Sequence, residues 1–225
     1  MEERLVDLAQ RLAQRLPPGD LDQTLAAITA AAVAVLPEVT MSSISVKHAD
    51  GSLETVAPTH ELLRDVDAVQ YELREGPCYE AAADTANVVA SYLASDERFP
   101  RYRRAALDAG IRAQVGIRLF DARSSQAALN LYSDKAGAFQ DLGSLGDLFR
   151  EQSAMALAYA HEIQNLRDAV STRQLIGQAV GVVMERYQLN DQRAFAFLAR
   201  LSQTRNTKLR VVAEELVAQL DEASG

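Results

Sequence analysis

The residues near the carboxyl end of the chain have the types and the spacing needed to contact a polyanion. Seven polar or basic residues fall within eleven consecutive positions: Arg200, Ser202, Gln203, Arg205, Asn206, Lys208 and Arg210. Arg193 lies seven residues before Arg200, so both side chains share one face of a helix. Guanidinium and ammonium groups bind the phosphates of nucleic acids, and polar side chains bind unpaired bases. A solvated helix surface has the same composition, so these residues alone predict a candidate site and not a function.

The charge of the chain is distributed unevenly. Its formal net charge is −8, from 23 basic and 31 acidic residues. Residues 1–170 hold 16 basic and 25 acidic residues, a balance of −9, whereas residues 171–225 hold 7 and 6, a balance of +1. An acidic body joined to a mildly basic tail places any contact with a polyanion in the tail.

The rest of the chain offers few residues with catalytic or metal-binding spacing. Cys78 is the single cysteine, which excludes an internal disulfide. Its thiol could sense a redox change or bind a ligand such as haem, although a small buried side chain is the simpler interpretation. The histidines, which lack metal-ligand spacing, are His48, His60 and His161. We therefore expect no catalytic residues, no metal site and no enzyme activity, and the sequence identifies no cofactor.

Periodic patterns in the first 160 residues predict an α+β fold with an antiparallel sheet flanked by helices. The polar and apolar residues alternate in two segments, which predicts hairpins over residues 40–59 and 113–133. Asp50 and Gly51 supply the turn of the first hairpin. Helices are expected over residues 2–16, 21–36 and 61–72, with Asp20 as the cap of the second.

A long helix is predicted over residues 147–187, because neither proline nor glycine occurs between Asp147 and Ile176. Twelve residues keep a spacing of three and four: Leu145, Leu148, Gln152, Met155, Tyr159, Glu162, Leu166, Ala169, Arg173, Ile176, Val180 and Val183. Because three of them are polar, they form an imperfect coiled-coil seam. We expect a homodimer through residues 147–183 and the N-terminal helix, which carries Leu5, Leu8 and Leu12 on one face. In the alternative, the first half of the long helix packs on the sheet.

The last fifty residues predict a small bundle of three helices. Asn190 or Asp191 caps the second helix, Asn206 ends it in the left-handed conformation, and Thr207 caps the third. The residues of the second helix expected to face inward are Ala194, Phe195, Leu198 and Leu201. The first helix contains Gly177 and Gly181, each of which destabilises a helix by about 1 kcal/mol relative to alanine. We expect these glycines to allow the close approach of a neighbouring helix or of a second copy.

The tail resembles the ANTAR domain, an RNA-binding antitermination module of bacterial regulators. The similarity is carried by "LIGQAVGVVMERY" and "RAFAFLARLSQTRNTKLRVVAEELV". The segments "YELREGPCYEA", "GIRLF" and "ALNLYS" resemble a GAF domain of the type that precedes ANTAR modules in actinobacterial proteins. The resemblance implies a GAF-like sensor domain over residues 1–160, including the N-terminal helix, and an ANTAR-like domain over residues 161–225. The long helix joins the two.

The ANTAR resemblance implies binding to paired hairpins in a nascent leader RNA, which blocks an overlapping terminator. Residues carried over as RNA-binding are Gln178, Arg186, Arg193, Arg200, Ser202, Arg205, Asn206, Lys208 and Arg210. Val180 stands where ANTAR sequences commonly have a lysine, which removes one phosphate contact. The GAF resemblance implies control by a signal, with a small-molecule ligand or Cys78 as the sensing element.

A DNA-binding helix-turn-helix is the alternative function, because three short helices with basic residues fit it on composition. The sequence "EEL" in the third helix argues against it, because two acidic residues are unfavourable in a groove lined by phosphates. The N-terminus is charged from its second residue and no apolar run has the length of a membrane span. We expect a cytoplasmic protein.

Overall fold

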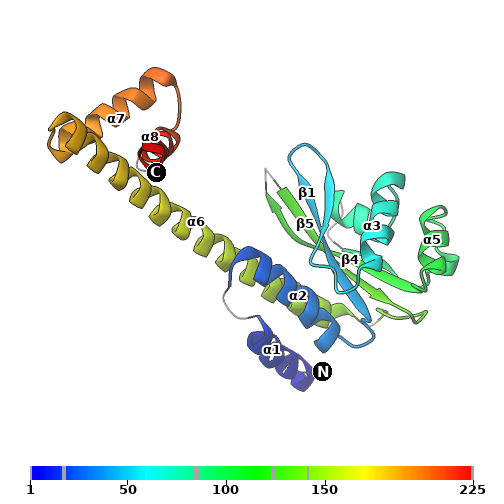
Figure 1. Cartoon of the computed structure of the whole chain (residues 1–225). Helices are drawn as coiled ribbons and strands as arrows, with labels where there is room; N and C mark the ends of the chain where they lie inside the picture. The colour runs from blue at the N-terminus through cyan, green and yellow to red at the C-terminus, as the bar shows by residue number, and fades with distance from the viewer. Residues whose placement is uncertain (1, 17–18, 84–86, 123–124, 141, 224–225) are drawn as a thin grey trace. The chain divides into compact units, whose positions relative to one another are not determined.

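The computed structural model describes residues 2–16, 19–83, 87–122, 125–140 and 142–223, and Figure 1 shows the chain. The contacts divide it into two compact units, the N-terminal unit of residues 1–161 and the C-terminal unit of residues 162–225. One helix, α6 (Gly143–Tyr187), contributes to both units. None of the helices in the described part of the chain combines the length and the hydropathy of a membrane span.

The N-terminal unit contains a five-stranded antiparallel sheet with the strand order β2-β1-β5-β4-β3. The strands are β1 (Met41–His48), β2 (Leu53–Val56), β3 (Asn87–Ala90), β4 (Ala113–Ala122) and β5 (Ser125–Ser133). The predicted hairpins are β1–β2 and β4–β5, and Gly51 has a φ of +84° in the first turn, as that tight connection requires. Both hairpins are confirmed, as is the α+β class.

Helices cover both faces of the sheet, as Figure 1 shows. The helices of the N-terminal unit are α1 (Glu2–Arg15), α2 (Leu21–Val35), α3 (Leu62–Leu73), α4 (Pro77–Ala83), α5 (Tyr102–Asp108) and the start of α6, with the short 3-10 helix η1 (Leu93–Ser95). Ile44, Leu129 and Leu131 lie in the core on the side of α2 and α6, whereas Ala128 and Tyr132 lie in the core on the side of α3, α4 and α5. Successive strand residues point to opposite faces, so each strand serves both cores.

Two short elements of the N-terminal unit, α4 and β3, have no counterpart among the elements that the sequence predicts. Helix α4 has seven residues and strand β3 has four, which is too short for a periodic pattern to identify either. Strand β3 extends the sheet by pairing with β4, with Val88 opposite Gly116. The sheet therefore has a fifth strand that the pattern of the two hairpins does not predict.

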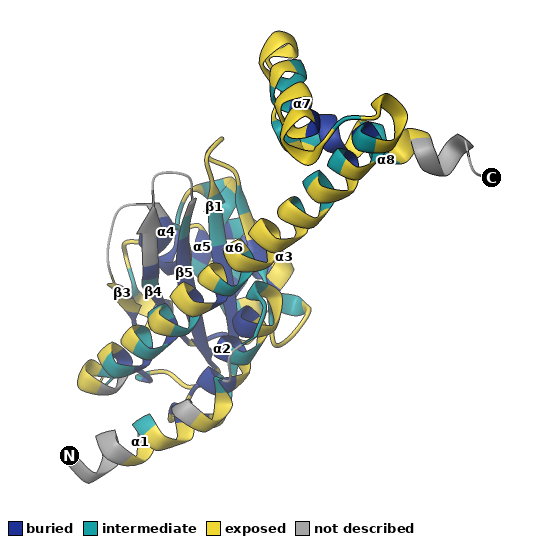
Figure 2. Cartoon of the chain, turned by 90° about the vertical axis from the view of Figure 1, so that its left-hand side faces the viewer, coloured by how far each residue is buried: buried dark blue, intermediate teal, exposed yellow. Residues whose placement is uncertain are grey.

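Helix α6 presents different residues to the sheet and to solvent. Phe149, Leu157 and Ala160 are buried on the sheet side. Met155 and Tyr159 of the predicted seam have 52% and 63% of their surface exposed, and Figure 2 shows much of α6 in the colour of exposed residues. The first half of α6 therefore packs on the sheet, as the alternative interpretation states, but mainly through residues outside the seam. Of the seam residues, Leu148 packs against the same core and is partly buried.

Candidate functional site

Capping residues fix where the helices of the C-terminal unit begin and end. The Asn190 side chain accepts a hydrogen bond of 2.9 Å from the Arg193 backbone N–H, which starts α7 (Asp191–Arg205). Asn206 ends α7 in the left-handed conformation, with a φ of +50°. Both caps confirm the prediction. The expected cap at Thr207 is wrong, because its hydroxyl donates to the Arg205 carbonyl at 3.1 Å, and α8 (Leu209–Ala223) starts after Lys208.

Most of the residues assigned to nucleic-acid binding lie on the surface of the C-terminal unit. The exposed ones are Gln178, Arg186, Arg193, Arg200, Arg205, Asn206, Lys208 and Arg210. Ser202 is half-buried, and its hydroxyl donates to the Thr207 carbonyl at 2.5 Å. Ser202 and Asn206 therefore build the turn between α7 and α8, whereas the basic side chains point to solvent.

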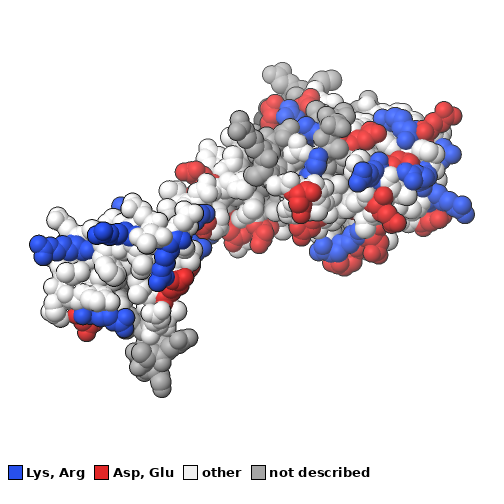
Figure 3. Space-filling model, turned by 90° about the horizontal axis from the view of Figure 1, so that it is seen from above, with Lys and Arg blue, Asp and Glu red and all other residues white. Residues whose placement is uncertain are grey.

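The exposed basic residues fall into two groups by their ion pairs. Arg205 lies 2.8 Å from Glu215, and Arg210 lies 2.5 Å from Glu214. The others between Arg173 and Arg210, which have no carboxylate partner among the described residues, are Arg173, Arg186, Arg193, Arg200 and Lys208. Between Arg173 and Arg210 the sequence holds seven basic residues and two acidic ones. Figure 3 shows Lys and Arg side chains on this unit, at the left of the view. A polyanion would meet an excess of positive charge on the segment from Arg173 to Arg210.

The aromatic residues of the C-terminal unit are more exposed than the sequence pattern predicts. Phe195 was expected to face inward with Ala194 and Leu198, but 48% of its surface is exposed, so this expectation is wrong. Phe197 is 41% exposed and Tyr187 is 54% exposed. The buried face of α7 is narrow and consists of Ala194 and Leu198, so the large side chains on either side of it reach solvent. The exposed rings are a feature that the helical periodicity did not reveal.

A groove lies between α6 and α7 beside Phe195. Its volume is about 490 Å³, and its walls are formed by Asp168, Ala169, Thr172, Arg173, Ile176 and Phe195. Asp168 and Arg173 give it one acidic and one basic side chain, while the other walls are mostly apolar.

The structure corrects the interpretation of Gly177 and Gly181 as sites of close approach within the chain. Both glycines are exposed, and a Cβ added at either one would meet no neighbouring atom within 4 Å. The core of the C-terminal unit lies on another face of α6, through Ala179 and Val183. Val183, the last residue of the predicted seam, is 1% exposed and so belongs to this core and to no interface.

A stripe of exposed residues recurs at helical spacing along α6. Its apolar members are Met155, Tyr159, Leu166 and Val170, at spacings of four, seven and four residues. Gly177 and Gly181 continue the same spacing. The stripe resembles one half of a helix–helix interface, with large side chains at one end and none at the other.

The N-terminal unit buries a polar cluster between the sheet and α3. Asp67 lies at its centre and accepts hydrogen bonds from Ser43 at 2.8 Å, from Thr55 at 3.1 Å, from Gln70 at 3.2 Å and from the Tyr132 hydroxyl. Burial raises the pKa of Asp67 to about 6, although these hydrogen bonds act in the opposite direction. An acid with this pKa changes its protonation state in the weakly acidic range.

Cys78 belongs to the same cluster and has no surface exposure. Its Sγ lies 2.9 Å from the Ser45 hydroxyl, and the Tyr71 hydroxyl lies 2.6 Å from the same Ser45 oxygen. Burial, followed by the charge of Asp67, raises the pKa of the Cys78 thiol. The thiolate is the reactive form of cysteine, so this environment suppresses the chemistry of a redox sensor.

A pocket of about 440 Å³ opens on the other face of the sheet, beside β3 and the start of α6. Val89, Val115 and Phe139 contribute apolar walls, and Gln140 and Asp147 contribute polar groups. The volume lies in the range of small-molecule sites.

Comparison with known proteins identifies the C-terminal unit more closely than the N-terminal one. Residues 164–217, which include the end of α6, all of α7 and most of α8, match the ANTAR domain family. No protein with a curated description is similar enough in sequence to match the chain.

Solved structures share the fold of the N-terminal unit at low sequence identity. The LuxR family transcription factor CepR2 from Burkholderia cenocepacia, which depends on N-acylhomoserine lactone, has a TM-score of 0.54, 15% identity and coverage of 70% of this chain and 96% of its own. A GAF sensor protein from Burkholderia vietnamiensis has a TM-score of 0.52 and 17% identity, and the match covers 71% of this chain and 98% of its own. Free methionine-R-sulfoxide reductase from Neisseria meningitidis, solved with its substrate, has a TM-score of 0.52 and 15% identity. That match covers 72% of this chain and 90% of the reductase. The fold is thus GAF-like and occurs in regulators and in an enzyme.

Proposed function

We propose that this chain, which has the architecture of a GAF-like fold followed by an ANTAR domain, is a signal-responsive RNA-binding transcription antiterminator. In this proposal the C-terminal unit binds paired hairpins in a nascent leader RNA. The N-terminal unit receives the signal and controls that binding. Both domain types are regulatory, and we assign no catalytic step to the chain.

One observation carries the proposal: the ANTAR match includes a segment in which basic residues outnumber acidic ones. Residues 164–217 include all seven basic residues from Arg173 to Arg210. Arg193, Arg200 and Lys208 have no carboxylate partner among the described residues, so their charges are available to phosphates. Each phosphate contact releases a counterion and makes the affinity depend on salt.

The signal in this proposal is a small molecule bound by the N-terminal unit. The pocket beside β3 has the volume for such a ligand, and it adjoins Gly143 and Gly146 at the start of α6. A ligand there contacts the helix that continues into the C-terminal unit. Oxidation of Cys78 is a less suitable signal than ligand binding, because this cysteine is buried and the pKa of its thiol is raised.

The active form in this proposal is a homodimer formed through α6. Met155, Tyr159, Leu166 and Val170 expose large apolar surfaces at helical spacing, which is unusual for a monomer. Light scattering at micromolar concentration should give a mass near twice 24.5 kDa. Leu166→Glu should produce monomers, and the matched exposed variant Arg167→Glu should not. A monomeric wild-type protein would contradict the dimer without affecting RNA binding by one chain.

The test of the RNA-binding function is a pull-down of cellular RNA by the full chain, followed by sequencing of the bound leaders. We expect enrichment of leaders with two adjacent hairpins. Titrations should then show that Arg200→Ala and Lys208→Ala each lower the salt slope of binding by about 0.7 to 0.9. The matched variant Arg210→Ala, whose residue pairs with Glu214, should change the slope less.

Duplex DNA is the control for the alternative function. A helix-turn-helix regulator would bind duplex DNA as tightly as hairpin RNA or more tightly. In that case the RNA proposal is wrong. Glu214 and Glu215 of α8 lie against Arg210 and Arg205, which disfavours α8 as a reading helix.

A further inference from the structure

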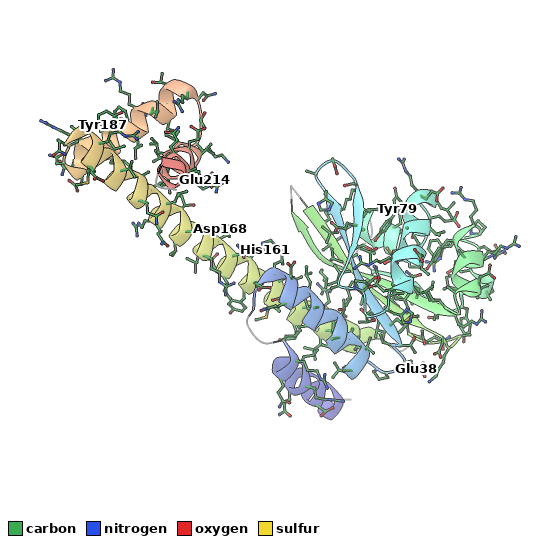
Figure 4. All side chains as sticks on the ribbon, in the orientation of Figure 1. Glu38, Tyr79, His161, Asp168, Tyr187 and Glu214 are labelled. Atoms are coloured by element: carbon green, nitrogen blue, oxygen red, sulfur yellow. The ribbon has the colours of Figure 1, made fainter. Side chains whose placement is uncertain are left out.

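Two aromatic rings form an exposed apolar surface where α6 ends and α7 passes. Tyr187 is the last residue of α6, and Figure 4 labels it there. Its ring centroid lies 5.5 Å from that of Phe197, with an interplanar angle of 39°. Tyr187 is 54% exposed and Phe197 is 41% exposed, so the pair offers ring surface to solvent and does not close the core.

Two arginines lie on the same flank of α7 as Phe197. Arg193 precedes Phe197 by four residues and Arg200 follows it by three, so the three side chains share one side of the helix. The two arginines are about 10 Å apart along the helix axis, one on each side of the ring. Neither has a carboxylate partner among the described residues.

We propose that Tyr187 and Phe197 form a stacking surface for an unpaired RNA base, and that Arg193 and Arg200 bind the phosphates on either side of it. This inference rests on the proposed RNA-binding function. A nucleotide matches both features at once, because its base has an apolar π-face and its phosphates are anionic. Stacking of this kind is tolerant of sequence, so the surface would contribute affinity for unpaired loops more than choice among bases.

The opposite flank of α7 provides a natural comparison. Phe195 is 48% exposed, which is similar to Phe197, but it lies beside the groove that contains Asp168. The groove also contains Arg173, so its two charges offset each other, and this flank attracts a polyanion less than the flank with two arginines. Phe195→Leu is therefore a matched control for Phe197→Leu, since both substitutions keep an apolar side chain and remove an exposed ring.

The experiment uses the full chain and a tandem-hairpin RNA with 2-aminopurine at one unpaired loop position. A fully paired RNA duplex of equal length serves as the reference probe. Phe197→Leu and Tyr187→Leu should each weaken hairpin binding about tenfold and leave the salt slope unchanged, because stacking releases no counterions. They should also reduce the quenching of 2-aminopurine in the bound state. Phe195→Leu should change neither quantity by more than about twofold.

Arg193→Gln and Arg200→Gln test the second half of the inference. Each should lower the salt slope by about 0.7 for hairpin RNA, in contrast to the ring variants. Circular dichroism of every variant should match the wild type, which separates lost contacts from lost folding.

Three outcomes would overturn the inference. If the wild type binds hairpin RNA but the ring variants bind equally well, the stacking surface is wrong and the proposed function stands. If the wild type binds no RNA, the proposed function fails first. If the ring variants keep RNA affinity and lose self-association, the surface is a contact between copies of the chain.

Discussion

The two units of this chain treat their polar and aromatic side chains in opposite ways. The N-terminal unit buries an aspartate, a cysteine and two tyrosines in one hydrogen-bonded cluster around Asp67. The C-terminal unit exposes three aromatic rings and several arginines without carboxylate partners among the described residues. The polar side chains of the N-terminal unit are therefore bonded to one another inside a core, whereas the exposed side chains of the C-terminal unit are accessible to a binding partner.

This difference separates the parts of the molecule that hold the fold from those that are free to bind. Removing a group from the buried cluster leaves donors without acceptors, so it should change stability strongly. Removing an exposed group of the C-terminal unit should change stability little and binding more. The predictions below test this division.

The largest effect is expected for Asp67→Ala. The substitution removes the acceptor shared by Ser43, Thr55 and Gln70, and each buried donor left without a partner costs about 1–3 kcal/mol. We expect a loss of about 4 kcal/mol in the free energy of unfolding, measured by urea titration at pH 5. The control is Asp65→Ala on the exposed side of α3, where the change should stay within about 0.5 kcal/mol. Equal effects at both positions would show that the cluster is not a stabilising network.

The second effect is a dependence of stability on pH that originates in Asp67. Its pKa in the folded protein is about 6, above the ordinary value of 3.8, so the folded state binds the proton more tightly than the unfolded state. The resulting stability is fully present below about pH 4 and is lost as the pH rises through about 6, on the order of 3 kcal/mol in total. Hydrogen bonds and ion pairs lower the pKa of Asp50 and Asp96, which act in the opposite direction.

The measurement compares wild type with Asp67→Asn between pH 4 and pH 8. The asparagine cannot titrate, so the difference between the two stability curves isolates the contribution of Asp67. We expect the wild type to lose stability relative to the variant as the pH rises. A constant difference would contradict the raised pKa.

A third and smaller effect concerns the exposed glycines of α6. Gly177→Ala and Gly181→Ala should each stabilise the C-terminal unit by about 1 kcal/mol, because the added methyl group meets no atom. Thermal melts should rise. Gly116→Ala is the opposite control, because its Cβ would lie 2.4 Å from the Pro77 carbonyl oxygen, and the variant should be destabilised. A fall in the melting temperature at Gly181 that vanishes on dilution would place a second copy against this part of the stripe.

The smallest effect is expected at the surface ion pairs of the C-terminal unit. The side chains of Arg210 and Glu214 are 52% and 46% exposed, so their pairing in water contributes at most about 0.5 kcal/mol. Glu214→Gln should leave the denaturation midpoint nearly unchanged. It should also free Arg210 and strengthen binding to RNA slightly at low salt. A large loss of stability would show that this surface supports the fold and is less free than proposed.

The sequence predicts the helices and strands of this fold better than it predicts which of them pack or pair with one another. Alternating residues identify both hairpins, and the caps at Asn190 and Asn206 locate the ends of α7, because these signals are local. Strand β3 escapes the pattern because four residues show no periodicity and its pairing partner is distant in sequence. Helical spacing likewise places Phe195 near the inner face, but the narrow contact of α7 leaves it outside.

The buried polar cluster lies beyond the reach of the sequence for the same reason. The alternation of Ser43, Ile44 and Ser45 shows that β1 has two different faces, but it does not show that α3 and α4 cover the polar one. Only the pairing of β1 with β5 brings Asn130 beside these serines. The basic residues of the tail can be predicted from the sequence more readily, because their exposure does not depend on pairing with a distant segment of the chain.

The chain has one cysteine, and its side chain is fully buried. The rate at which this thiol can be modified therefore measures how often the N-terminal unit opens. An alkylating reagent reaches the Cys78 thiol only in molecules whose α4 has moved away from β1, so the modification rate reports how often that happens. No labelling mutation is needed, and the C-terminal unit is silent because it holds no thiol. Compounds that lower the rate of Cys78 modification stabilise the closed N-terminal unit, and compounds that raise the rate favour its opening. Mass spectrometry of the intact chain can therefore rank candidate signals before any RNA target is identified.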